Sequence, residues 1–66
     1  MQNKIAELRR ERGLTQQVLA GKLGVSRQTV ISLENGKYNP SIKLAHAIAS
    51  EFDLTIEEVF VFEEGE

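Results

Sequence analysis

Four neighbouring polar side chains, Arg27, Gln28, Thr29 and Ser32, are of the types that read the edges of DNA base pairs. An Arg guanidinium can donate two hydrogen bonds to guanine, a Gln amide can pair with adenine, and a Thr methyl group can pack on the methyl group of thymine. If the segment is a helix, these side chains face outward while the apolar residues between them face a core. The spacing therefore predicts a recognition helix for the major groove.

The elements that would position this helix can be identified in the preceding residues. A second short helix is expected at about 16–23 and the recognition helix at about 27–35. Gly24 lies in the turn between them, where a positive φ angle is expected. Ala20 lies where the two helices would approach most closely, and Val30 and Leu33 would hold the recognition helix on the core. We interpret residues 16–35 as a helix-turn-helix.

Residues 1–66 are predicted to form one all-α domain, in which a short strand could follow the last helix. Helices are expected at about 3–12, 16–23, 27–35, 42–52 and 56–60, followed by an extended segment at 61–62 and a frayed tail at 63–66. Their expected N-caps are Asn3, Thr15, Ser26, Ser41 and Thr55, and the last would form a capping box with Glu58. Glycines at 13, 24 and 36 would end three of these helices.

The charged residues are segregated along the chain, so the formal net charge of −2 conceals two halves. All eight basic residues lie between Lys4 and Lys43, where three acidic residues leave a charge of +5. From Leu44 onward there are seven acidic residues and neither Lys nor Arg. This division favours an N-terminal part that faces a polyanion and a C-terminal part that faces solvent or a partner.

Composition excludes several other classes of protein. The 66 residues contain no cysteine and one histidine, so neither disulfides nor a metal site is expected. There is no catalytic triad and no phosphate-binding glycine loop, so we expect neither an enzyme nor a cofactor. A chain of this size has little room for a small-molecule pocket. No apolar run is long enough to span a bilayer, and the expected location is the cytoplasm.

A set of short motifs supports a more specific assignment. They are Leu14-Thr15-Gln16, Leu19-Ala20, Leu23-Gly24-Val25-Ser26-Arg27-Gln28-Thr29-Val30, Leu33-Glu34-Asn35-Gly36-Lys37 and Tyr38-Asn39-Pro40-Ser41. With these motifs the segment 5–60 resembles the Cro/phage-repressor (Xre-like) helix-turn-helix domains. It is most similar to short stand-alone repressors of the cytolysin-repressor kind. The resemblance implies a five-helix, lambda-repressor-like bundle that binds DNA as a dimer.

The resemblance also implies roles for individual residues. Arg27, Gln28 and Ser32 would contact bases. Phosphates would be held by Gln16, Asn35, Lys37, Tyr38, Asn39 and Ser41, although Tyr38 could instead pack in the hinge. Arg9 and Glu34 would form a buried salt bridge between the first and third helices.

Two positions depart from the usual pattern of these domains. Gly21 lies inside a helix, where it costs about 1 kcal/mol relative to Ala. Ile31 is apolar at a position that is usually small or polar, and it could cover the rim of the core or touch a sugar or a thymine methyl group. We favour the rim of the core.

The C-terminal apolar residues allow two interpretations. Leu54, Ile56, Val59, Phe60 and Phe62 could close the core of one chain or form a twofold interface across about residues 54–62. We favour the interface, since a palindromic operator requires a dimer.

The sequence thus predicts a homodimeric repressor that binds double-stranded DNA and covers a promoter. The alternative is an antitoxin or another partner-binding regulator that uses the same fold. The operator, the regulated genes and any protein antagonist are not specified by the sequence.

Overall fold

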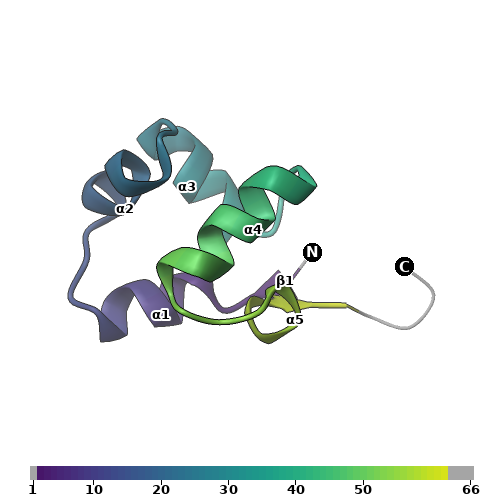
Figure 1. The fold of residues 1–66 in the computed structure, drawn as a ribbon. Coiled ribbons are helices and arrows are strands. Elements are labelled where there is room, and N and C mark those ends of the chain that lie inside the picture. Colours follow the sequence, from purple (N-terminus) through teal and green to yellow (C-terminus); the bar gives the residue numbers. More distant parts are fainter. Residues whose placement is uncertain (1, 63–66) are drawn as a thin grey trace.

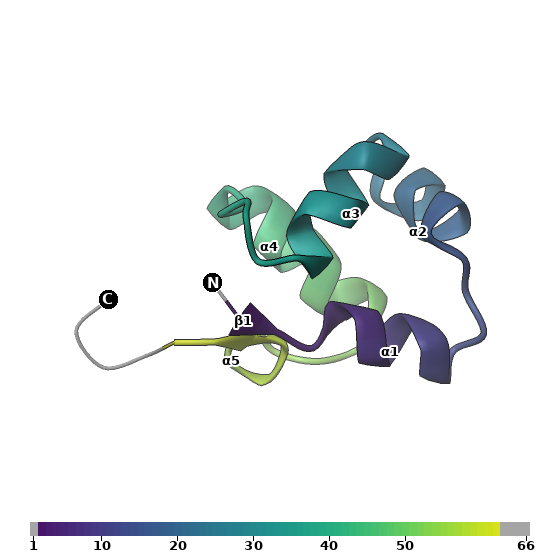
Figure 2. The same ribbon diagram turned by 180° about the vertical axis from the view of Figure 1, so that it is seen from behind.

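The computed structural model describes residues 2–62. Its elements are β1 (Gln2–Asn3), α1 (Ile5–Glu11), α2 (Gln16–Leu23), α3 (Arg27–Glu34), α4 (Ile42–Glu51), α5 (Ile56–Val59) and β2 (Phe60–Val61). Helices α2 and α3 form the upper part of the molecule, whereas α1, α5 and the two strands form the lower part (Figure 1). Helix α4 crosses between these two parts, and the opposite view shows the same arrangement (Figure 2). The predicted five-helix fold is confirmed.

Four of the five predicted N-caps are present. The hydroxyl groups of Thr15, Ser26 and Ser41 accept hydrogen bonds from the backbone N–H three residues later, at 3.0, 3.2 and 3.1 Å. Thr55 and Glu58 form the expected capping box, with distances of 3.2 and 2.9 Å. These local bonds satisfy helix N–H groups that have no partner inside the helix, which explains why α2 to α5 begin where they do.

The first helix begins later than the sequence suggested. Asn3 was expected to be its N-cap, but it lies in β1 and Lys4 occupies the N-cap position. The Asn3 side chain still accepts a hydrogen bond from Ile5 N at 3.1 Å, while its amide donates to Leu33 O at 2.7 Å. Asn3 therefore joins the start of α1 to the end of α3.

A two-stranded antiparallel sheet brings the two ends of the described chain together. Gln2 pairs with Val61 and Asn3 with Phe60, and Lys4 N donates to Val59 O at 2.8 Å. The C-terminal strand was expected one residue later, at 61–62, and the N-terminal strand was not predicted. The expected frayed tail at 63–66 lies outside the described residues.

One hydrophobic core holds all five helices. Its buried residues are Ile5, Leu19, Ala20, Val30, Leu33, Ala45, Ile48, Ala49, Phe52, Val59 and Phe60. Every helix contributes at least one of them, so the position of α3 depends on packing from the whole chain. Between residues 2 and 62, no helix is long and apolar enough to cross a membrane.

Candidate nucleic-acid interface

The turn between α2 and α3 is fixed by backbone geometry. Gly24 has φ +72°, in the left-handed region that glycine adopts without strain. A hydrogen bond from Val25 N to Ala20 O at 3.0 Å ties the next residue of the turn to the end of α2. Ala20 and Val30 are fully buried, so a small residue lies where α2 and α3 share the core. The turn and the shared core together set the direction of α3.

The four predicted base-reading residues differ in their exposure. Arg27 and Gln28 are exposed in the first turn of α3, whereas Thr29 and Ser32 are half-buried. The Thr29 hydroxyl also lies 3.0 Å from the hydroxyl of the N-cap Ser26. Arg27 and Gln28 are therefore the most accessible of the four, and Thr29 has a structural partner within the cap.

Most of the residues predicted to hold phosphates lie in one exposed segment after α3. Asn35, Lys37, Tyr38, Asn39 and Ser41 are all exposed. A hydrogen bond from Lys37 N to Ser32 O at 3.1 Å fixes the start of this segment. The hydroxyl of Ser41 caps α4, so its backbone and side chain are held at a helix N-terminus, where N–H groups favour an anion.

Gln16 and the Arg9–Glu34 pair form one network. Arg9 Nε lies 2.6 Å from Glu34 Oε2, and its two terminal nitrogens donate to Glu34 Oε1 at 3.3 Å and to Leu14 O at 2.9 Å. The Gln16 amide donates to Glu34 Oε1 at 3.1 Å. The side chains of Arg9 and Glu34 are only 12% and 7% exposed. The network therefore joins α1, the start of α2 and the end of α3.

The hydrogen bond with Glu34 raises the pKa of Arg9 above its usual value. Arg9 therefore stays charged. The link between Gln16 and Glu34 was not predicted, because a Gln at the start of a helix gives no signal of which acidic residue lies beside it. Within residues 2–62, every buried side-chain nitrogen and oxygen has a hydrogen-bond partner.

Several basic side chains support the fold itself. Lys22 lies 3.8 Å from Glu51, which links α2 to α4. Arg12 donates to Phe52 O at 2.9 Å, and its guanidinium lies 5.7 Å from the centre of the Phe52 ring. In the described part of the chain, Arg27 and Lys37 form no ion pair, so their charges remain available to an anionic partner.

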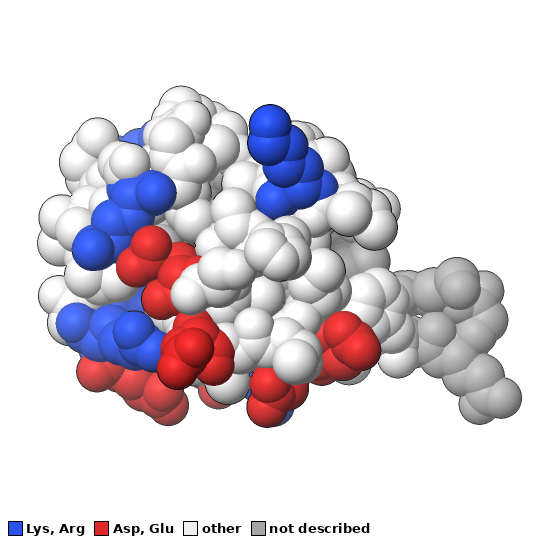
Figure 3. Space-filling model, in the orientation of Figure 1, with Lys and Arg blue, Asp and Glu red and all other residues white. Residues whose placement is uncertain are grey.

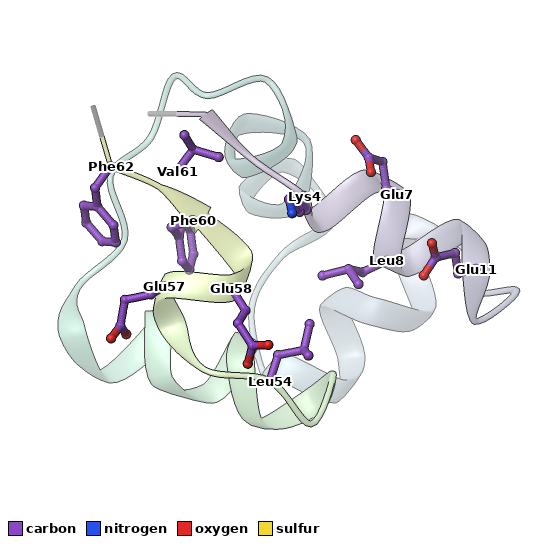
Figure 4. Close-up of a pocket in the computed structure, with 10 residues that line it drawn as sticks. All are labelled: Lys4, Glu7, Leu8, Glu11, Leu54, Glu57, Glu58, Phe60, Val61 and Phe62. Atoms are coloured by element: carbon purple, nitrogen blue, oxygen red, sulfur yellow. The ribbon is translucent and has the colours of Figure 1, made fainter. Parts of the chain in front are cut away.

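Acidic residues gather on the lower part of the molecule, where basic side chains also lie beside them, and further basic side chains lie over the upper part (Figure 3). A groove of about 730 Å³ lies on this acidic side. Glu7 and Glu11 of α1 and Glu57 and Glu58 of α5 border it, and Leu8, Leu54 and Phe60 are among its apolar lining (Figure 4). Acidic side chains from both halves of the sequence therefore meet at this groove.

The predicted dimer residues do not share one environment. Val59 and Phe60 are 0% and 2% exposed and belong to the core of the single chain, so their assignment to an interface is corrected. Leu54 and Ile56 are half-buried against that core. Phe62 is 56% exposed, and Ile42, which the sequence did not suggest, is 81% exposed. Val59 and Phe60 pack in the same core cluster as the buried residues of α1 to α4.

Within the described residues, no three His, Cys, Asp or Glu side chains are grouped closely enough to hold a metal ion.

Comparison with known proteins agrees with this geometry. A helix-turn-helix family model matches residues 5–59. An uncharacterised HTH-type transcriptional regulator of Methanocaldococcus jannaschii is 53% identical over 66 residues, covering all of both chains. The regulator YgzD of Bacillus subtilis, also an uncharacterised HTH-type transcriptional regulator, is 45% identical over 64 residues and 97% of each chain.

A solved structure shares the fold and part of the sequence. The restriction-modification controller protein C.AhdI from Aeromonas hydrophila superimposes with a TM-score of 0.76 at 33% identity, over 86% of this chain and 83% of that one. The family consists of DNA-binding regulators rather than enzymes. The chain therefore belongs to the helix-turn-helix family of transcriptional regulators, of the Cro/phage-repressor (Xre-like) type.

Proposed function

We propose that this regulator binds a palindromic DNA operator as a homodimer and represses transcription by covering a promoter. The observation that carries the proposal is the two-sidedness of α3. Arg27 and Gln28 are exposed in its first turn, while Val30 and Leu33 are 0% and 1% exposed in the core. A helix held in this way can present the same two side chains to base edges in every molecule.

Base reading would rest mainly on Arg27 and Gln28. An Arg guanidinium matches O6 and N7 of guanine, and a Gln amide matches N6 and N7 of adenine. Ser32 and Thr29 are less accessible and would contribute only where a base edge comes close. Hydrogen-bonded base reading would therefore be concentrated in the first turn of α3.

Phosphate contacts would set the depth and orientation of α3 in the groove. The exposed segment that follows α3 supplies Lys37, Tyr38, Asn39 and Ser41. On the other side, Gln16 uses one amide hydrogen to hold Glu34. An amide has two such hydrogens, so the second remains for a phosphate oxygen.

A second copy would pack on an apolar patch formed by Pro40, Ile42, Ile56 and Phe62, around a hollow of about 130 Å³. Ile42 and Phe62 are 81% and 56% exposed, although apolar side chains of this size are usually covered. A twofold axis through this patch would relate two recognition helices, which on DNA must lie about 34 Å apart.

Two measurements test this function. Selection of bound duplexes from random DNA should enrich a palindromic sequence. Enrichment of a non-palindromic sequence, or no enrichment at all, would contradict the proposal. In analytical ultracentrifugation at micromolar concentration, the natural chain should sediment as a dimer. The double variant Ile42→Ser with Phe62→Ser should sediment as a monomer, whereas Val18→Ser, at an exposed valine of α2, should remain dimeric.

The repression mechanism has its own test. A reporter promoter that overlaps the selected operator should be silenced when the protein is present. A promoter with the operator placed upstream of the polymerase site should be unaffected, because there is nothing to cover. Activation from the upstream position would overturn repression by covering while leaving DNA binding intact.

A further inference from the structure

We propose that Ile31 determines operator specificity by packing on the C5-methyl group of a thymine in the major groove. This inference rests on the proposed DNA-binding function and adds an apolar contact to it. The sequence left two readings of Ile31 open and favoured a place on the rim of the core. The structure provides observations that separate those readings.

The first observation concerns packing. The half-buried apolar residues that pack on the core of the described chain are Leu8, Leu14, Leu23, Val25, Leu44, Leu54 and Ile56. Ile31 is also half-buried, but it is not one of them. The expected place on the core rim is therefore corrected, and core packing does not account for an isoleucine at this position.

The second observation concerns direction. Successive residues of an α-helix are rotated by about 100°. Val30 and Leu33 point into the core, so Gln28 points almost directly away from it. By the same geometry Ile31 and Ser32 lie about 50° to either side of that outward direction. Ile31 is thus on the same face as the exposed Gln28 and one helical turn after Arg27.

The side chain of Ile31 suits the one apolar feature of the major groove. An isoleucine side chain has no hydrogen-bonding group, so it gains nothing from the polar base edges. The apolar feature of the major groove is the methyl group on C5 of thymine. A 5-methylcytosine carries a methyl group at the same ring position, and an aliphatic side chain would pack on either. Beside Arg27 and Gln28, which recognise donors and acceptors, Ile31 would add recognition of shape and apolarity.

The experiment replaces single thymines in the selected operator by deoxyuridine, which removes only the methyl group. For the natural chain, replacement of the contacted thymine in one half-site should weaken binding about fourfold, the effect of losing one buried methyl contact. Ile31→Ala should bind both operators equally, because the partner of that methyl group is gone. Ile31→Val should restore discrimination. An operator with cytosine at the same position should be bound more tightly when that cytosine is methylated at C5, with isoleucine or valine at position 31 but not with alanine.

Controls separate the possible outcomes. Val18→Ala removes exposed aliphatic surface from α2 and should leave discrimination between thymine and deoxyuridine unchanged. If no operator is selected at all, the proposed function fails before Ile31 is tested. If the operator binds but no thymine is sensitive to loss of its methyl group, or if Ile31→Ala remains sensitive, the role of Ile31 is overturned. A large drop in thermal stability of Ile31→Ala with unchanged discrimination would return it to the core.

Discussion

The outward face of α3 and the groove between α1 and α5 are built on the same core but differ in chemistry. On α3, Arg27 and Gln28 are exposed, while the opposite side of the helix packs on the core. At the groove, four glutamates border an apolar lining. The formal net charge of −2 therefore says little about the partner of this protein. The kind of partner that each surface can bind depends on where the charged side chains lie. These four glutamates also disfavour an orientation that places the groove against DNA.

The largest expected effect comes from breaking the network that connects the two regions. Arg9→Ala leaves the Glu34 side chain, which is only 7% exposed, without its guanidinium partner. Loss of one member of a buried pair costs about 3–5 kcal/mol, so the free energy of unfolding should fall by that amount. Chemical denaturation followed by circular dichroism measures it. Arg10→Ala, which removes an exposed charge from the same helix, is the matched control and should change stability little. An unchanged melting temperature for Arg9→Ala would rule out the structural role of the network.

The next largest effect should be confined to the recognition face. Arg27→Ala and Gln28→Ala should each remove about 1–3 kcal/mol of discrimination at one base pair in each half-site. The two variants should relax different base pairs, since their side chains differ by one position on α3. Gel-shift titrations against a panel of operator variants would detect this. A uniform loss of affinity across the panel would instead indicate that these residues bind phosphate.

A smaller effect is expected from the loop after α3. Lys37→Ala should weaken binding to all sequences alike and lower the slope of log K against log salt by about 1 per subunit. Arg10→Ala removes the same charge from the lower side and should leave the slope unchanged. Titrations at several salt concentrations distinguish the two. Equal slopes for both variants would mean that position on the surface does not matter.

The smallest effect should come from neutralising the groove. Replacing Glu7, Glu11 and Glu57 by Gln should raise DNA affinity by less than about twofold at physiological salt, because charges beyond about 8 Å are screened. Base preference should not change. A shift in the selected operator sequence would show that the groove takes part in recognition, and the distinction between the two regions would then be lost.

Local signals made much of this fold predictable. Thr15, Ser26, Ser41 and Thr55 were identified as caps because their side chains bond to backbone groups only three residues away. Arg27 and Gln28 could be placed on the outside because Val30 and Leu33 fix which side of the helix is buried. These arguments need only the spacing of residues within one or two helical turns.

Long-range features were missed for a physical reason. The pairing of Asn3 with Phe60 joins two-residue strands from opposite ends of the chain, and so short a segment has no detectable periodicity. The sequence offered the core as one of two interpretations of Phe60 but favoured the interface, because an apolar residue near the end of the chain does not reveal by itself whether it packs inside one chain or between two. Gly21 stays without an explanation, since a side chain at that position would meet nothing within 4 Å.

The small β1–β2 sheet has a consequence for how the molecule completes its folding. Its strands are separated by nearly the whole chain, so closing them costs more loop entropy than forming any neighbouring helix contact. The hydrogen bond from Lys4 N to Val59 O at the end of this sheet should form late. Deuterium exchange at the Lys4 amide, followed during refolding, therefore reports when this last step of folding occurs. The measurement needs no DNA.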